Sequence, residues 1–204
     1  MVVAVGDRFL YWVNLLRGII FADVSAKDPV LRYVSLPVEP LLRRRYDFEA
    51  CPEDHRRVCA TGGDGSTVRF VEVAPRSCCG GPGRTACTRS RYAFTITTWT
   101  LRMEDMMWEK DGLVDCQELW SLYGYQGLPR ARPTHPIVSL EDPDVICLVV
   151  HKNKYIRDVD GEDGTWVIEV DTRCKNIRSI RNDEAFYNQG FLPSELSKYF
   201  NIRC

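Results

Sequence analysis

Residues 7–24, DRFLYWVNLLRGIIFADV, contain two apolar segments separated by a short polar dipeptide. Valine, isoleucine, phenylalanine, tyrosine and tryptophan dominate both segments, as they do in β-strands. The dipeptide Arg17-Gly18 separates the two segments, so we expect a β-hairpin that turns there. The apolar run in the second segment is nearly continuous, which predicts that both faces of Ile19, Ile20 and Phe21 are covered.

Strand-like segments recur along the rest of the chain. The next is LRYVSLP (31–37), which Pro37 ends because proline cannot continue a paired strand. The later segments that predict strands are TVRFVEVAP (67–75), YAFTITTWTLR (92–102), IVSLEDPDVICLVVHK (137–152) and TWVIEVDTRCKNIRSI (165–180). We expect the last two segments to be strand pairs, turned at the acidic Glu-Asp-Pro-Asp run and around residues 172–175.

Other segments predict turns, loops and short helices. Residues 103–120 fit two strands turned at Asp111-Gly112 and followed by a helical turn. Residues 38–66 are polar without a sustained period, so we expect a long loop there and a second one over 75–91. The stretch LPSELSKYF (192–200) has apolar residues at helical spacing, which predicts a short C-terminal helix.

The spacing of these strands indicates the fold class. Short antiparallel strands occur in groups of three or four at intervals of roughly 40 to 50 residues, which is the period of β-propeller blades. We therefore predict a mainly β fold with a partial, propeller-like arrangement, and the alternative is a β-sandwich with the same number of strands. A chain of 204 residues is expected to form one β-rich domain over residues 1–204.

Charge and cysteine usage limit the partners and the compartment. The formal net charge is −1, so no strong attraction to nucleic acid or to an acidic membrane surface is predicted. The first 24 residues lack a basic leader and contain charged positions inside the apolar run, unlike a secretory signal. Nine cysteines without an Asn-x-Ser/Thr acceptor indicate mostly free thiols in a reducing compartment. We expect an intracellular protein of the cytoplasm or nucleus that is not secreted.

The cysteine-rich stretch SCCGGPGRTAC (77–87) is the most visible candidate for chemistry. Zinc requires four ligands, usually in pairs with fixed spacing. The candidate ligands in and before this stretch are His55, Cys59, Cys78, Cys79 and Cys87. They form a site only if two distant loops meet, so we favour a glycine-rich connection between strands and expect neither metal nor cofactor.

Signatures of catalysis are absent from the sequence. GGDGST (62–67) has glycines but no phosphate-binding lysine, no G-x-S-x-G segment occurs, and the three histidines have no companion pattern. We therefore predict that the protein is not an enzyme. Among the tryptophans, Trp12, Trp99 and Trp166 lie in expected strands and are assigned to the core, whereas Trp108 and Trp120 are equally compatible with contacts to a partner.

A family resemblance follows from a set of segments in a fixed order. These are YWVNLLRGIIFADV, LRYVSLPVEP, FTITTWTLRMEDMMWEKDG, IVSLEDPDVICLVV, TWVIEVD and LPSELSKYF. Together they resemble a plant family, abundant in grasses, called domain of unknown function 1618. The resemblance implies a β-rich, propeller-like domain, similar in style to the domains that follow F-boxes, with no established enzymatic activity. Members of this family have a longer stretch before the hairpin, so this chain is expected to be a shortened member with an open sheet edge.

These observations predict a non-enzymatic, intracellular domain that binds another protein. The open edge also predicts possible self-association, because an unpaired strand is a template for pairing. Two alternatives remain open: a substrate-recognition module of a ubiquitin ligase, and a metal-binding protein or enzyme whose site is assembled from distant loops.

Overall fold

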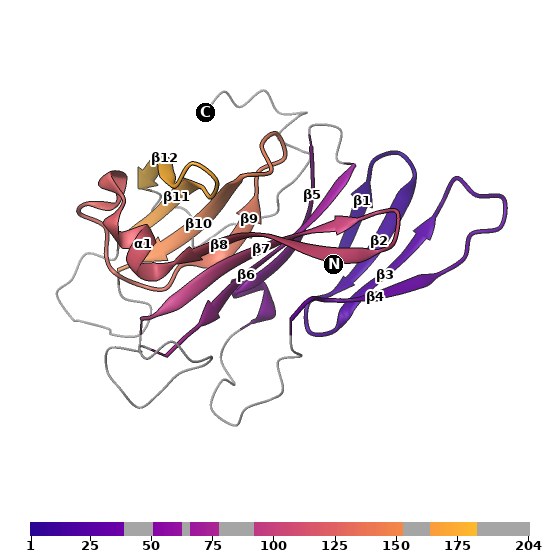
Figure 1. The fold of residues 1–204 in the computed structure, drawn as a ribbon, viewed down its shortest axis with the longest axis horizontal. Coiled ribbons are helices and arrows are strands. Elements are labelled where there is room, and N and C mark those ends of the chain that lie inside the picture. Colours follow the sequence, from indigo (N-terminus) through magenta and orange to yellow (C-terminus); the bar gives the residue numbers. More distant parts are fainter. Residues whose placement is uncertain (39–50, 63–65, 78–91, 153–163, 183–204) are drawn as a thin grey trace.

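The computed structural model describes residues 1–38, 51–62, 66–77, 92–152 and 164–182. These residues form three antiparallel sheets of four strands each, which we call the first, middle and third sheets. Each sheet is a meander, because strands that are consecutive in the chain are neighbours in the sheet (Figure 1). The protein is therefore mainly β, as predicted.

The strands of the three sheets have the following bounds. The first sheet contains β1 (Val2–Val5), β2 (Phe9–Asn14), β3 (Gly18–Asp23) and β4 (Arg32–Ser35). The middle sheet contains β5 (Arg56–Thr61), β6 (Thr67–Pro75), β7 (Phe94–Arg102) and β8 (Met107–Asp115). The third sheet contains β9 (Thr134–Val138), β10 (Val145–His151), β11 (Thr165–Asp171) and β12 (Asn176–Asn182).

Helical structure in the described residues is limited to short pieces. They are the α-helix α1 (Cys116–Ser121) and the 3₁₀ turns η1 (Pro52–Asp54) and η3 (Tyr123–Tyr125). The Asp115 side chain accepts a hydrogen bond from the Gln117 backbone N–H (2.9 Å) and caps α1 at the end of β8. None of the described helices has the length and apolar character needed to cross a membrane.

The three sheets are arranged like consecutive propeller blades. The first strands of the sheets meet, because β1 contacts β5 and β5 contacts β9, while the remaining strands extend outward in chain order (Figure 1). This confirms the predicted partial, propeller-like arrangement. Across the described ranges the three sheets do not close into a ring.

The middle sheet is covered on both faces. On β6, Val68 and Phe70 point toward the first sheet and belong to a core that includes Tyr11. The alternating positions Val71 and Val73 point the other way, into the core shared with the third sheet. All four of these β6 side chains are buried, which agrees with the apolar character of TVRFVEVA and with the period of two in a strand.

Strand β5 corrects the prediction of a continuous loop over residues 38–66. Its sequence RRVCAT begins with two arginines, which we interpreted as part of a solvated segment. Arg56 is instead buried, because it lies opposite Glu72 on β6 and forms an ion pair with it at 2.6 Å. It also donates to the Leu15 carbonyl oxygen, in the turn between β2 and β3, at 3.1 Å. Strand β1, before the expected hairpin, was missed as well.

The predicted turn at Asp111-Gly112 is also wrong, because β8 continues through it. The register of β7 and β8 shifts by one residue there, so Asp111 forms a β-bulge. Its carboxylate accepts hydrogen bonds from the hydroxyls of Thr98 (2.6 Å) and Thr100 (2.5 Å). Arg69 on β6 pairs with the same carboxylate at 3.1 Å. These partners hold Asp111 against the sheet, where an isolated Asp-Gly pair would form a turn.

The other expected elements have mixed outcomes. The hairpin turning at Arg17-Gly18 and the strands expected within residues 31–37, 67–75, 92–102, 137–152 and 165–180 are confirmed. The helical turn after β8 is confirmed as α1. Of the second predicted loop, residues 78–91 lie outside the described residues, and so does the predicted helix at 192–200.

Replacement of Asp111 tests the role of the bulge. Asp111→Ala removes the acceptor of two threonine hydroxyls and the counterion of the buried Arg69. We expect the free energy of unfolding, measured by urea titration, to fall by about 1–3 kcal/mol. The control is Asp28→Ala, an exposed position for which we expect a change within about 0.5 kcal/mol. Equal stabilities of the two variants would contradict this role.

Candidate functional site

The first sheet has one face toward the middle sheet and one face away from it. We call the second face the outer face. The register of β1 to β4 places on it the alternate residues Val2, Ala4, Leu10, Trp12, Asn14, Gly18, Ile20, Ala22, Tyr33 and Ser35. None of these residues is charged, and most are apolar. The outer face therefore has the composition of a face that packs against protein.

Four large side chains form a continuous row across the outer face. Val2 lies opposite Trp12, Trp12 opposite Ile20, and Ile20 opposite Tyr33, so the row crosses all four strands. Their exposed fractions are 57% for Val2, 39% for Trp12, 44% for Ile20 and 60% for Tyr33. Aromatic side chains exposed in this way are typical of the centres of protein interfaces.

The close approach of Tyr33 to Gly18 fixes one end of this row. The Tyr33 hydroxyl donates a hydrogen bond to the Arg17 carbonyl oxygen at 3.1 Å. A Cβ atom at Gly18 would meet the Tyr33 side chain at 2.6 Å and the Val34 carbonyl oxygen at 2.5 Å. Glycine at this position therefore lets the tyrosine lie over the turn of the β2–β3 hairpin.

Two predictions about this sheet are wrong. Ile20 is exposed, so only one face of the Ile19–Phe21 segment is covered, and Trp12 lies on the outer face instead of in the core. Both faces of β2 and β3 carry apolar residues, so the hydrophobic pattern could not distinguish an inner strand from a strand with an exposed apolar face.

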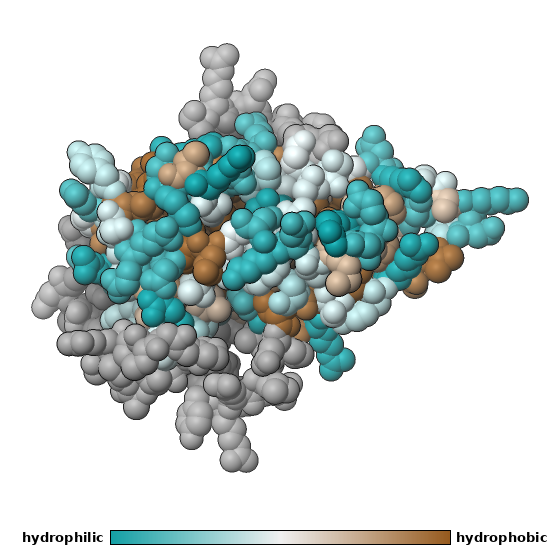
Figure 2. All heavy atoms as spheres, viewed as in Figure 1, coloured by the Kyte–Doolittle hydropathy of each residue, from teal (hydrophilic) through white to brown (hydrophobic). Residues whose placement is uncertain are grey.

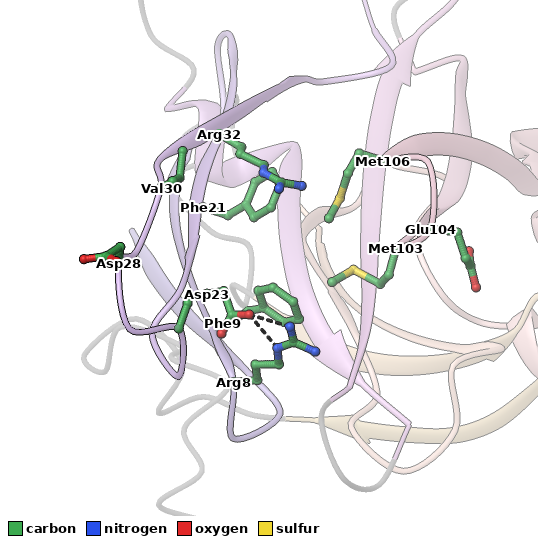
Figure 3. A pocket seen from close by; sticks show the side chains of 11 residues that line it. Arg8, Phe9, Phe21, Asp23, Asp28, Val30, Arg32, Met103, Glu104 and Met106 are labelled. Atoms are coloured by element: carbon green, nitrogen blue, oxygen red, sulfur yellow. Dashed lines mark hydrogen bonds and ion pairs between the residues drawn. The ribbon is translucent and has the colours of Figure 1, made fainter.

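A cleft lies on the opposite, inner side of the first sheet. It has a volume of about 460 Å³ and is bounded by the first sheet and by the connection between β7 and β8 (Figure 3). Its apolar lining residues are Phe9, Phe21, Ala26, Val30, Met103 and Met106. The sequence contained no signal for this cleft, because its two walls come from segments about 70 residues or more apart and meet only through sheet packing.

The charged residues around the cleft differ in orientation. The guanidinium groups of Arg8 and Arg32 point into the space between the aromatic rings and the methionines, whereas the Asp28 and Glu104 carboxylates point away (Figure 3). Arg8 is paired with Asp23 at 2.6 Å. The hydrogen bond from Arg8, followed by that from the Ser25 hydroxyl, lowers the pKa of Asp23 to about 2.

This arrangement is suited to binding. The rings of Phe9 and Phe21 and the thioethers of Met103 and Met106 form walls that accept an apolar group. Arg32 supplies a positive charge at the mouth, and Asp23 stays ionised and paired with Arg8 at neutral pH. The cleft is therefore suited to accept an apolar group.

The connection between β3 and β4 extends the surface at this end of the molecule. It projects from the body of the protein as a long hairpin (Figure 1). Hydrophobic side chains lie among hydrophilic ones at this projecting end (Figure 2). Val24, Val30 and Leu31 are the exposed apolar residues of the connection.

The structure places two of the five candidate metal ligands. His55 follows η1, and its Nε2 lies 3.5 Å from an Arg132 guanidinium nitrogen. Cys59 is buried on β5 in the core between the middle and third sheets. Cys78, Cys79 and Cys87 lie outside the described residues. Within the described ranges no cluster of three or more His, Cys, Asp or Glu side chains is placed to hold a metal ion.

The remaining tryptophans are all partly buried. Trp99 and Trp108 pack on the core between the first and middle sheets, and Trp166 and Trp120 pack on the core between the middle and third sheets. The Trp108 indole N–H also donates to the Ser35 carbonyl oxygen at 2.9 Å, which joins the middle sheet to the first. Trp108 and Trp120 thus contribute to packing, whereas Trp12 is the exposed tryptophan in the described residues.

Comparison with known proteins identifies a related family. The sequence model of the family described as protein of unknown function (DUF1618) matches residues 12–147, which is more than half of the chain. The matched segment runs from β2 to β10 and includes the middle sheet completely. No curated protein and no solved structure matches the chain.

Thiol reactivity tests the environment of Cys59. Burial raises the pKa of the Cys59 thiol to about 11, so we expect it to be protonated at neutral pH and to become reactive only as the pH approaches that value. At about pH 8, iodoacetamide should label the exposed Cys174 at least about 100-fold faster than Cys59 in the folded protein. Peptide mass spectrometry measures both rates, and similar rates would contradict the buried position.

Zinc content tests the composite site. Since the Cys59 thiol lies in an apolar core and its pKa is raised, it is a poor source of a thiolate ligand. We expect protein purified without chelators to contain less than about one tenth of an equivalent of zinc by elemental analysis. About one equivalent, retained through gel filtration, would contradict this expectation and would favour the composite site.

Proposed function

Because the chain belongs to the DUF1618 family, whose function is unknown, we propose a role from its surface: it is a non-enzymatic, intracellular protein-interaction domain that binds through the outer face of the first sheet. The observation that carries this proposal is the exposed row of Val2, Trp12, Ile20 and Tyr33 on a face without charged residues.

The chemistry of the row supports binding to protein. The largest contiguous apolar patch on a monomeric protein is typically about 300–600 Å² and is often an interaction site. Trp12 and Tyr33 supply large, rigid contact areas with few rotatable bonds, which is why such residues dominate binding energies. The formal net charge of −1 gives no comparable support for nucleic acid as the ligand.

The thiols support the intracellular part of the proposal. All five cysteines in the described residues are free thiols, and two of them are exposed. Exposed free thiols persist in a reducing compartment. The resemblance to domains that follow F-boxes suggests a narrower role, substrate recognition in a ubiquitin ligase, which the identity of a bound partner would test.

Affinity capture with variants of the outer face tests the proposal. The baits are the native chain, Ile20→Lys and the control Ile180→Lys, which changes another partly exposed isoleucine, on β12 of the third sheet. We expect specific proteins from an extract of the native source, in reducing buffer, to be retained by the native and control baits. Ile20→Lys should retain them at least about ten-fold less, because a lysine would be desolvated in the interface.

The outcomes separate the possibilities. Proteins retained equally by all three baits would show that the outer face is not the binding surface, and repeated capture of nothing specific, a second copy of the chain included, would overturn the proposal. Retention of a ubiquitin-ligase adaptor by the native bait would assign the narrower role.

A further inference from the structure

We propose that the outer face binds a second copy of this chain, so that two first sheets pack face to face in a two-fold symmetric dimer. This inference rests on the proposed function, because it names the partner of the same surface.

The chain itself shows what kind of surface fits the outer face. Its inner sheet faces pack on one another, with Tyr11 and Phe21 of the first sheet against Phe70 of the middle sheet in a shared core. A similar apolar contact joins the middle and third sheets. The outer face carries the same types of side chain at the same alternate positions, so its natural complement is another sheet with an apolar face.

The absence of charge on the outer face makes it compatible with itself. In a two-fold contact each residue near the axis meets its own counterpart, so a charged residue there would face a like charge. Trp12 and Ile20 are on the central strands β2 and β3 and would lie near that axis. Their pairing across the axis buries apolar surface without desolvating a charge.

The opposite end of the molecule does not offer a matching exposed face, because Val149 and Val167, which point away from the middle sheet, are already buried. On β11, Ile168 and Val170 point toward the middle sheet, so the alternating residues Glu169 and Asp171 point away from it. Glu169 pairs with Arg181 at 3.0 Å and Asp171 with Arg178 at 2.7 Å. Covering these ion pairs with an apolar sheet would cost desolvation energy. A head-to-tail chain of copies is therefore disfavoured, and a closed dimer is favoured.

The edges of the sheets are less suited to self-association than the outer face. The first strands β1, β5 and β9 are also edge strands, but β5 lies against both β1 and β9, and the last strand of each sheet carries charged residues. They include Arg32 on β4, Glu109 and Lys110 on β8, and Arg178 and Arg181 on β12. Charges on edge strands oppose edge-to-edge pairing. We therefore expect two copies of the chain to associate through their outer faces, and not through the open sheet edge that the sequence suggested.

The size of the outer face sets the expected strength of the dimer. Four strands of this length, at ordinary strand spacing, present a face of roughly 400 Å². Two copies would bury about twice that area, which is in the range of weak, transient complexes, below about 1,200 Å² in total. We therefore expect a dimer that forms with increasing concentration in the micromolar range.

Analytical ultracentrifugation of the full chain in reducing buffer tests the dimer. Between about 5 and 500 µM, the weight-average mass of the native chain should rise from 23.5 kDa toward twice that value and no further. Ile20→Lys should weaken dimerisation at least about ten-fold, and the control Ile180→Lys should leave it unchanged. Val2→Lys, on the edge strand β1 in the same row, provides a second disrupting variant if Ile20→Lys does not fold.

Three outcomes would overturn the dimer. A native chain that stays monomeric throughout the range, a mass that grows beyond the dimer, or a dimer that both lysine variants on the row leave intact would each reject it. A monomeric native chain whose captured proteins still depend on Ile20 would reject the dimer and leave the proposed function standing. A dimer without any captured protein would make the second copy the partner itself.

Discussion

The burial of the middle sheet on both faces is the constraint on which the rest of the structure depends. Val68 and Phe70 need one apolar partner surface, and Val71 and Val73 need another on the other side. Neither the first nor the third sheet can be removed without exposing half of these side chains to water. The order of the three meanders along the chain meets this requirement directly, because the middle sheet is also second in sequence.

Double burial of one sheet requires its charged residues to be paired within it. Arg56 and Arg69 are both buried, and each forms an ion pair with a carboxylate of another strand of the sheet, Glu72 and Asp111. These pairs explain two errors of sequence interpretation with one physical cause. The two arginines that begin β5 locally indicate a solvent-exposed loop, and the Asp-Gly pair in β8 locally indicates a turn. Here both instead form cross-strand contacts between segments that are distant in sequence.

The first and third sheets differ in the residues on the face that points away from the middle sheet. The third sheet carries ion pairs on the side away from the middle sheet, while the outer face of the first sheet is apolar. Val149 and Val167 on that side of the third sheet are already buried, so the exposed apolar row of the first sheet distinguishes the two ends of the molecule. The cleft between the first sheet and the β7–β8 connection adds a second apolar feature at the same end, with Arg8 and Arg32 at its border.

The sequence alone was sufficient for the elements whose signals are local. The hairpin at Arg17-Gly18 and the strands at its sides follow from residue type, and the repeated groups of strands indicate blades because each meander is continuous in the chain. The exposed position of Trp12, the bulge at Asp111 and the walls of the cleft depend on which face of a sheet meets another sheet. No local pattern specifies that choice, because both faces of the first sheet are apolar, and it is settled only when distant segments pack together.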